Sequence, residues 1–115
     1  MDTDNITDTD YECEYNRLQE MFPNAQFSIC IDLEYMDELL TDKNFIIIKQ
    51  PYTCYCYVNC VKNTDYFYIK GHMTYRHIIE QLIEQGLSLN CNHHFLEGFC
   101  TTNISDCQYE MVLGS

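Results

Sequence analysis

Cysteine and histidine are the residues of this chain that could do chemistry. Its 115 residues include eight cysteines and four histidines. Thiolates and imidazoles serve as nucleophiles, general bases and zinc ligands, so redox exchange, cysteine–histidine catalysis and metal binding all have to be weighed. No C-x-x-C occurs in the sequence. The usual dithiol redox motif and the usual zinc knuckle are therefore both missing.

The densest cluster of candidate metal ligands lies near the C-terminus: Cys91, His93, Cys100 and Cys107. Together they could supply the four nitrogen and sulfur donors of a tetrahedral zinc site. Their spacing matches no common structural zinc site, so we expect no cofactor and keep a small zinc-stabilised module as the alternative. The other interpretation of this stretch is a loop or short helix whose apolar residues pack inward: Phe95, Leu96 and Phe99.

Signatures of catalysis are weak throughout the chain. The sequence contains no Gly-rich phosphate loop, no G-x-S-x-G elbow and no H-E-x-x-H motif. Nothing singles out one cysteine as activated, and four glycines leave little room for an oxyanion-forming turn. We therefore expect no catalytic residues, and a cysteine–histidine enzyme is the third interpretation.

Acidic residues are concentrated at the front of the chain. The net charge is −12, and residues 1–42 hold twelve acidic side chains against Arg17 alone. Such a segment should repel nucleic acid and anionic membranes and attract a basic protein. In the alternative interpretation it is a solvated segment that only keeps the chain soluble. Residues 1–10 have almost nothing to bury, so we expect a disordered acidic head followed by a single domain at residues 11–115.

The clearest structural signal is a strand, a turn and a helix over residues 66–86. Thr74 stands where a helix N-cap should be, and apolar residues follow at i, i+3, i+4, i+7 and i+8: Tyr75, Ile78, Ile79, Leu82 and Ile83. Gly86 can take the left-handed conformation that ends a helix, and Leu87 can fold back on Leu82. The pattern predicts a helix at residues 75–85 with one buried face.

The remaining elements are mostly strands. A short helix is expected at residues 11–22, and strands at 27–33, 45–49, 52–61 and 66–70. The apolar run at 45–49 indicates a strand buried on both faces, and the last two strands are expected to form a hairpin. The fold class is therefore α+β, with a mostly antiparallel sheet of about four strands and the helix at 75–85 packed on it.

Tyrosines on the last two strands form the candidate interaction surface: Tyr55, Tyr57, Tyr66 and Tyr68. In the strand at 52–61, the period of two separates Tyr55 and Tyr57 from the cysteine-bearing face, which we expect to be core. Tyrosine offers a large contact area with a polar handle, which suits a protein interface. In the alternative interpretation, the same tyrosines pack under the helix or a second sheet layer.

Two segments of the chain resemble segments of known proteins: YIKGHMTYRHIIEQLIEQGL and CNHHFLEGF. Together with the abundant Asn, Tyr, Ile and Cys, they resemble small uncharacterised proteins of mimivirus-type giant DNA viruses of amoebae. The resemblance implies a viral protein in the host cytoplasm, the virus factory or the particle, and it transfers no catalytic residues. The absence of a membrane-spanning run and of a secretory signal is consistent with a cytoplasmic setting.

These observations combine into one prediction. The chain should be a small acidic protein-interaction domain, a viral accessory or virion-associated protein without catalytic activity. Its partner should be a protein, with a basic one favoured by the charge, and neither nucleic acid nor a membrane.

Overall fold

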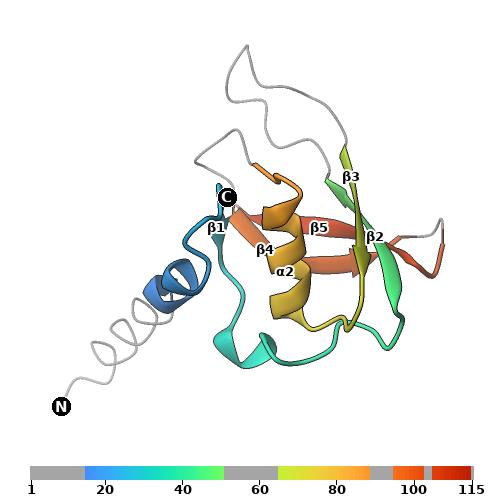
Figure 1. Ribbon diagram of the computed structural model, residues 1–115, viewed down its shortest axis with the longest axis horizontal. Coiled ribbons are helices and arrows are strands. Elements are labelled where there is room, and N and C mark those ends of the chain that lie inside the picture. Colours follow the sequence, from blue (N-terminus) through green and yellow to red (C-terminus); the bar gives the residue numbers. More distant parts are fainter. Residues whose placement is uncertain (1–14, 51–64, 89–94, 103–104, 115) are drawn as a thin grey trace, which may run out of the picture.

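The computed structural model describes residues 15–50, 65–88, 95–102 and 105–114. A helix covers residues 15–21. The elements that follow it in chain order are β1 (Ser28–Ile29), the 3-10 helix η1 (Leu33–Tyr35), β2 (Phe45–Gln50), β3 (Asp65–Lys70), α2 (Tyr75–Glu84), β4 (Phe95–Thr101) and β5 (Gln108–Gly114) (Figure 1). The α+β class is confirmed. The described residues form five strands, one more than expected.

The sheet is mixed and has the order β1-β4-β5-β2-β3. β2 pairs with β3, and β4 with β5, in the antiparallel sense, whereas β1–β4 and β2–β5 are parallel. The expected, mostly antiparallel sheet is therefore wrong in detail. The predicted hairpin involves residues 52–61, which lie outside the described residues, so it stays a prediction; within the described sheet β3 pairs with β2.

Both ends of α2 are closed as the sequence predicted. Thr74 accepts a hydrogen bond from the backbone N–H of His77 at 3.1 Å. At the other end Gly86 has a φ of +87°, and the Leu87 N–H donates to the Leu82 carbonyl at 2.9 Å. With the bond from Gly86 N–H to the Ile83 carbonyl, 3.0 Å long, this is a Schellman motif.

The loop after η1 completes the N-terminus of α2. The backbone N–H groups of Tyr75 and Arg76 donate to the carbonyls of Glu38 and Met36 at 3.1 and 3.0 Å. These are N–H groups that a helix cannot satisfy internally. Because the loop and Thr74 occupy them, this helix end offers no free donors for an anion.

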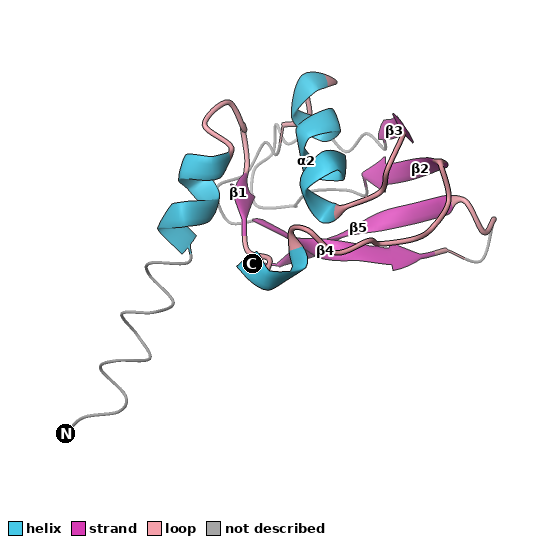
Figure 2. Cartoon of the chain, turned by 60° about the horizontal axis from the view of Figure 1, so that its bottom comes forward, coloured by secondary structure: helices cyan, strands magenta, loops and turns pink. Residues whose placement is uncertain are grey.

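The core lies between α2 and one face of the curled sheet (Figure 2). Its fully buried side chains come from almost every element: Ile29, Met36, Ile46, Ile48, Ile69, Met73, Ile78, Ile79, Leu82, Leu87 and Leu96. On β2 the burial alternates along the strand, with Ile46 and Ile48 inside and Phe45 38% exposed. The expectation that residues 45–49 are buried on both faces is therefore wrong.

The C-terminal region is a pair of strands, not the loop or short helix that the sequence suggested. A β-bulge between Leu96 and Gly98 shifts the register of β4 against β5. Leu96 pairs with Leu113 and Phe99 pairs with Met111, so two residues three positions apart lie on one face of the strand. The strand predicted at 27–33 is also shorter, because only Ser28 and Ile29 pair with β4 and Leu33 begins η1.

Candidate protein-interaction surface

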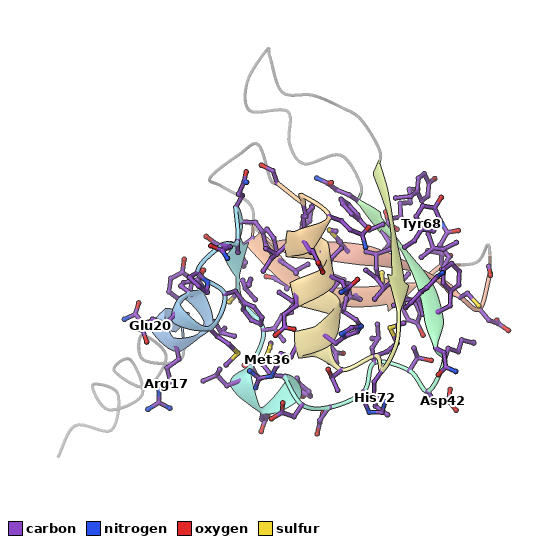
Figure 3. The ribbon with its side chains drawn as sticks, viewed as in Figure 1. Arg17, Glu20, Met36, Asp42, Tyr68 and His72 are labelled. Carbon is purple, nitrogen blue, oxygen red and sulfur yellow. The ribbon has the colours of Figure 1, made fainter. Side chains whose placement is uncertain are left out.

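The face of the sheet opposite α2 carries a row of exposed aromatic side chains. Strand alternation and the β2–β3 register place six residues on it, which we call the open face: Phe45, Ile47, Lys49, Tyr66, Tyr68 and Lys70. Tyr68 is 57% exposed and Tyr66 is 49% exposed. Figure 3 shows Tyr68 on the side of β3 that faces away from α2.

Two of these aromatic rings already contact each other. The ring centroids of Phe45 and Tyr68 are 6.4 Å apart with an interplanar angle of 20°, a stacked arrangement. They sit diagonally across two paired strands, where large side chains of one face meet. The rings are therefore held by their neighbours before any partner arrives, which lowers the entropy that binding would cost.

The open face differs in charge from the rest of the molecule. Lys49 and Lys70 lie on it, and Glu110 of β5 lies beside Lys49 in the parallel ladder. The acidic residues of the described chain are instead concentrated in the segment at residues 32–42 and on α2. The aromatic surface is thus locally basic although the net charge of the chain is −12.

A buried amide borders the aromatic row. Gln108 is directly opposite Ile47 in the β2–β5 ladder and so shares the open face. Its side chain is 8% exposed, and its Nε2 finds no hydrogen-bond acceptor in the described part of the chain. A buried donor without a partner costs about 1–3 kcal/mol.

Side chains of α2 and of its C-cap residue, Gln85, cover the outer edge of β3. Gln85 makes two reciprocal bonds to the backbone of Tyr68: its Nε2 donates to the carbonyl at 2.8 Å, and its Oε1 accepts from the N–H at 3.3 Å. The His77 Nε2 lies 2.7 Å from the Lys70 carbonyl. These contacts occupy backbone groups that an edge strand otherwise leaves free to pair with another chain.

The predicted interaction residues are only partly described. Tyr66 and Tyr68 are exposed on the open face, so the alternative in which they pack under the helix or a second layer is wrong for these two. Tyr55 and Tyr57 lie outside the described residues. Phe45 was not predicted as a surface residue, because the run FIIIK is typical of a fully buried strand.

Only two of the four candidate zinc ligands are among the described residues. Cys91 and His93 lie outside the described residues, while Cys100 on β4 is exposed and Cys107 before β5 is half-buried. The described residues contain no group of three or more metal-ligating side chains. The zinc module therefore stays a prediction, which elemental analysis of the purified chain can check.

Cys30 is an exposed thiol whose environment opposes ionisation. Burial raises the pKa of Cys30 above its ordinary value of 9.0, and the carboxylates of Glu97 and Asp32 raise this pKa further. A reactive cysteine needs the opposite setting, one that lowers the thiol pKa. Cys30 is thus a poor candidate for the nucleophile of a cysteine–histidine enzyme.

Comparison with known proteins found no relative. No protein-family model matches the chain, and neither curated proteins nor solved structures gave a match. None of the helices in the described ranges has the length and apolar character that a membrane crossing requires.

Proposed function

We propose that the chain is a protein-interaction module whose contact surface is the open face. The observation that supports this most is the aromatic row of Phe45, Tyr66 and Tyr68, three large side chains between 38% and 57% exposed on one side of a sheet. Aromatic residues are enriched at the centres of protein interfaces, where they supply much of the binding free energy.

The same proposal includes the setting that the sequence suggested. The chain acts as a viral accessory or virion-associated protein in the host cytoplasm, and it binds without catalysing a reaction. The acidic residues at 32–42 and on α2 favour a basic protein as the partner. The open face, with Lys49 and Lys70, adds a surface suited to an aromatic or acidic segment of that partner.

The test is co-purification of partners with a matched pair of variants. Tyr66→Ala/Tyr68→Ala removes two exposed side chains of the open face, whereas Tyr35→Ala removes a 42% exposed tyrosine on η1. Loss of an interface anchor of this kind costs about 2 kcal/mol or more, so the affinity for the partner should fall roughly thirtyfold for one tyrosine and roughly a thousandfold for both if the losses add.

Tyr35→Ala should retain the partner at the level of the unmodified chain. Equal retention by the double variant would refute the open face as the contact surface. Circular dichroism of both variants checks that the fold is kept.

A further inference from the structure

We infer that a groove between α2 and the end of the 15–21 helix binds a basic side chain, arginine or lysine, of a partner protein. This site lies apart from the open face and is formed by different residues. It gives the basic partner expected from the net charge a specific place to bind.

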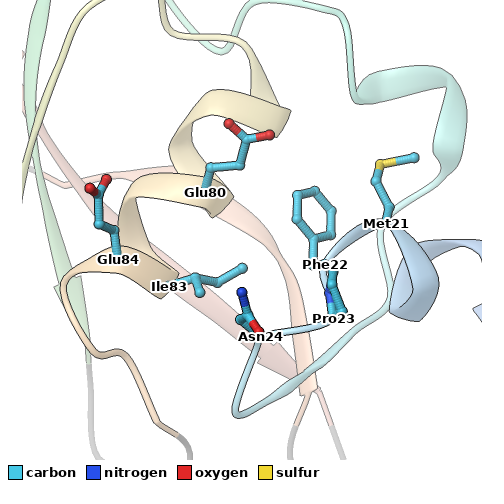
Figure 4. A pocket seen from close by; sticks show the side chains of 7 residues that line it. All are labelled: Met21, Phe22, Pro23, Asn24, Glu80, Ile83 and Glu84. Atoms are coloured by element: carbon cyan, nitrogen blue, oxygen red, sulfur yellow. The ribbon is translucent and has the colours of Figure 1, made fainter.

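The groove has an apolar floor and an acidic border. Its volume is about 310 Å³, at the lower end of the range for ligand pockets, which suits one or two side chains better than a whole small molecule. Phe22, which is buried, and the half-buried Met21 and Ile83 provide apolar surface. Figure 4 shows Phe22 and Ile83 facing the space between the two segments, with Glu80 and Glu84 on the α2 side.

The two carboxylates occupy positions that the helix itself does not favour. Glu80 and Glu84 are four residues apart, so they are neighbours of like charge on the helix surface. Glu84 is also the last residue of α2, where the helix dipole is negative, and the last turn contains no basic residue. Both interactions destabilise the free chain, and a bound cation would relieve both.

No cation of the described chain neutralises these carboxylates. Arg76 is four residues before Glu80, but its guanidinium pairs with Asp37 at 3.2 Å. Glu84 accepts a hydrogen bond from the Gln81 Nε2 at 3.1 Å, which is a neutral donor. Within the described residues, neither Glu80 nor Glu84 forms an ion pair.

Arginine and lysine match both parts of the groove. Their aliphatic stems cover apolar surface while the charged heads stay near water and carboxylates. The floor of Met21, Phe22 and Ile83 can take the stem, and Glu80 and Glu84 can take the head. Neither an acidic nor a purely apolar segment would use the acidic border.

The test uses a peptide probe and its neutral isostere. Acetyl-Ala-Arg-Ala-amide is titrated against the full chain, up to the solubility of the peptide, while the methyl signals of Met21 and Ile83 are followed by NMR. The same peptide with citrulline in place of arginine keeps the shape and removes the charge. We expect saturable shifts with the arginine peptide and binding about three- to tenfold weaker with citrulline, the scale of two surface ion pairs.

A matched pair of variants separates local binding from the overall field. Glu80→Gln/Glu84→Gln should weaken binding of the arginine peptide by the same factor. Glu34→Gln/Glu38→Gln changes the net charge equally at exposed positions outside the groove and should bind like the unmodified chain. Tyr66→Ala/Tyr68→Ala should not change this binding, so failure of the open face and failure of the groove are distinguishable.

Three results would overturn the inference: no saturable shift at Met21 and Ile83, equal affinity for the citrulline peptide, or equal weakening by both glutamate pairs. A melting temperature gives a second readout. The arginine peptide should raise the melting temperature of the unmodified chain and not that of Glu80→Gln/Glu84→Gln.

Discussion

Replacing Gln85 with alanine should remove both hydrogen bonds that close the edge of β3. The Gln85 side chain holds the N–H and the carbonyl of Tyr68 at 3.3 and 2.8 Å, as a neighbouring strand would. The alanine variant keeps the backbone of the helix C-cap, whose N–H still donates to Gln81. The change is therefore confined to the contact between the helix and the edge strand.

The size of the effect follows from the two bonds. A typical intramolecular hydrogen bond contributes about 0.5–1.5 kcal/mol, and both groups here are near water, so the lower end applies to each. The expected loss is about 1 kcal/mol in the free energy of unfolding, or about 4 °C in melting temperature for a chain of this size. Gln85→Glu should lose more, because a carboxylate repels the Tyr68 carbonyl and the negative end of the helix dipole.

Two measurements test this, with Gln81→Ala as the control. Within the described residues, the Gln81 side chain bonds only to Glu84, so its replacement should change the free energy of unfolding by less than about 0.5 kcal/mol. Sedimentation velocity should show more self-association for Gln85→Ala than for the unmodified chain, since the freed edge can pair with a second copy. If Gln85→Ala and Gln85→Glu both have the melting temperature and the sedimentation coefficient of the unmodified chain, the two hydrogen bonds do not protect this edge.

Three further predictions concern thiols, alkaline pH and the core. Cys30 is exposed, but its raised pKa should keep its alkylation slow near pH 8, with the rate still increasing as the pH rises past 9.0. Tyr75 has a pKa raised above its ordinary value of 10.0, first by burial and then by Tyr35, so its neutral form is favoured by folding; the free energy of unfolding should fall as pH increases above 10.0, and less so in Tyr75→Phe. Leu82 is fully buried on α2, and Leu82→Ala should cost about 2–5 kcal/mol in a urea unfolding experiment.

The strand–turn–helix unit could be predicted because its signals are local. Thr74, the apolar stripe and Gly86 each act within one or two helical turns, so the sequence contains the whole argument for α2. The alternation at residues 27–33 likewise placed Phe27, Ile29, Ile31 and Leu33 on one face; the first three are buried, whereas Leu33 is half-buried at the start of η1. It did not predict the length of the strand, because pairing depends on how far β4 extends beside it.

The features that the sequence did not predict depend on pairing between strands far apart in the chain and on which face of the sheet stays uncovered. The β4 bulge places Leu96 and Phe99 on one face at a spacing that is not typical of a strand. The run FIIIK is the same whether one or two layers cover the strand, so the open face could not be distinguished from a buried one. One strand could have been predicted but was not: the alternation of Tyr109, Met111 and Leu113 is typical of a strand and matches β5.

The most direct test of the open face as a protein-binding surface is site-specific photo-crosslinking. A benzoyl-phenylalanine is placed at position 68, and separately at position 35 as the exposed control, in the chain expressed in its native host cytoplasm. The proposal predicts a discrete crosslinked protein from position 68 that is absent from position 35 and that disappears when Tyr66 is also changed to alanine. The same adducts from both positions, or none from position 68, would contradict it.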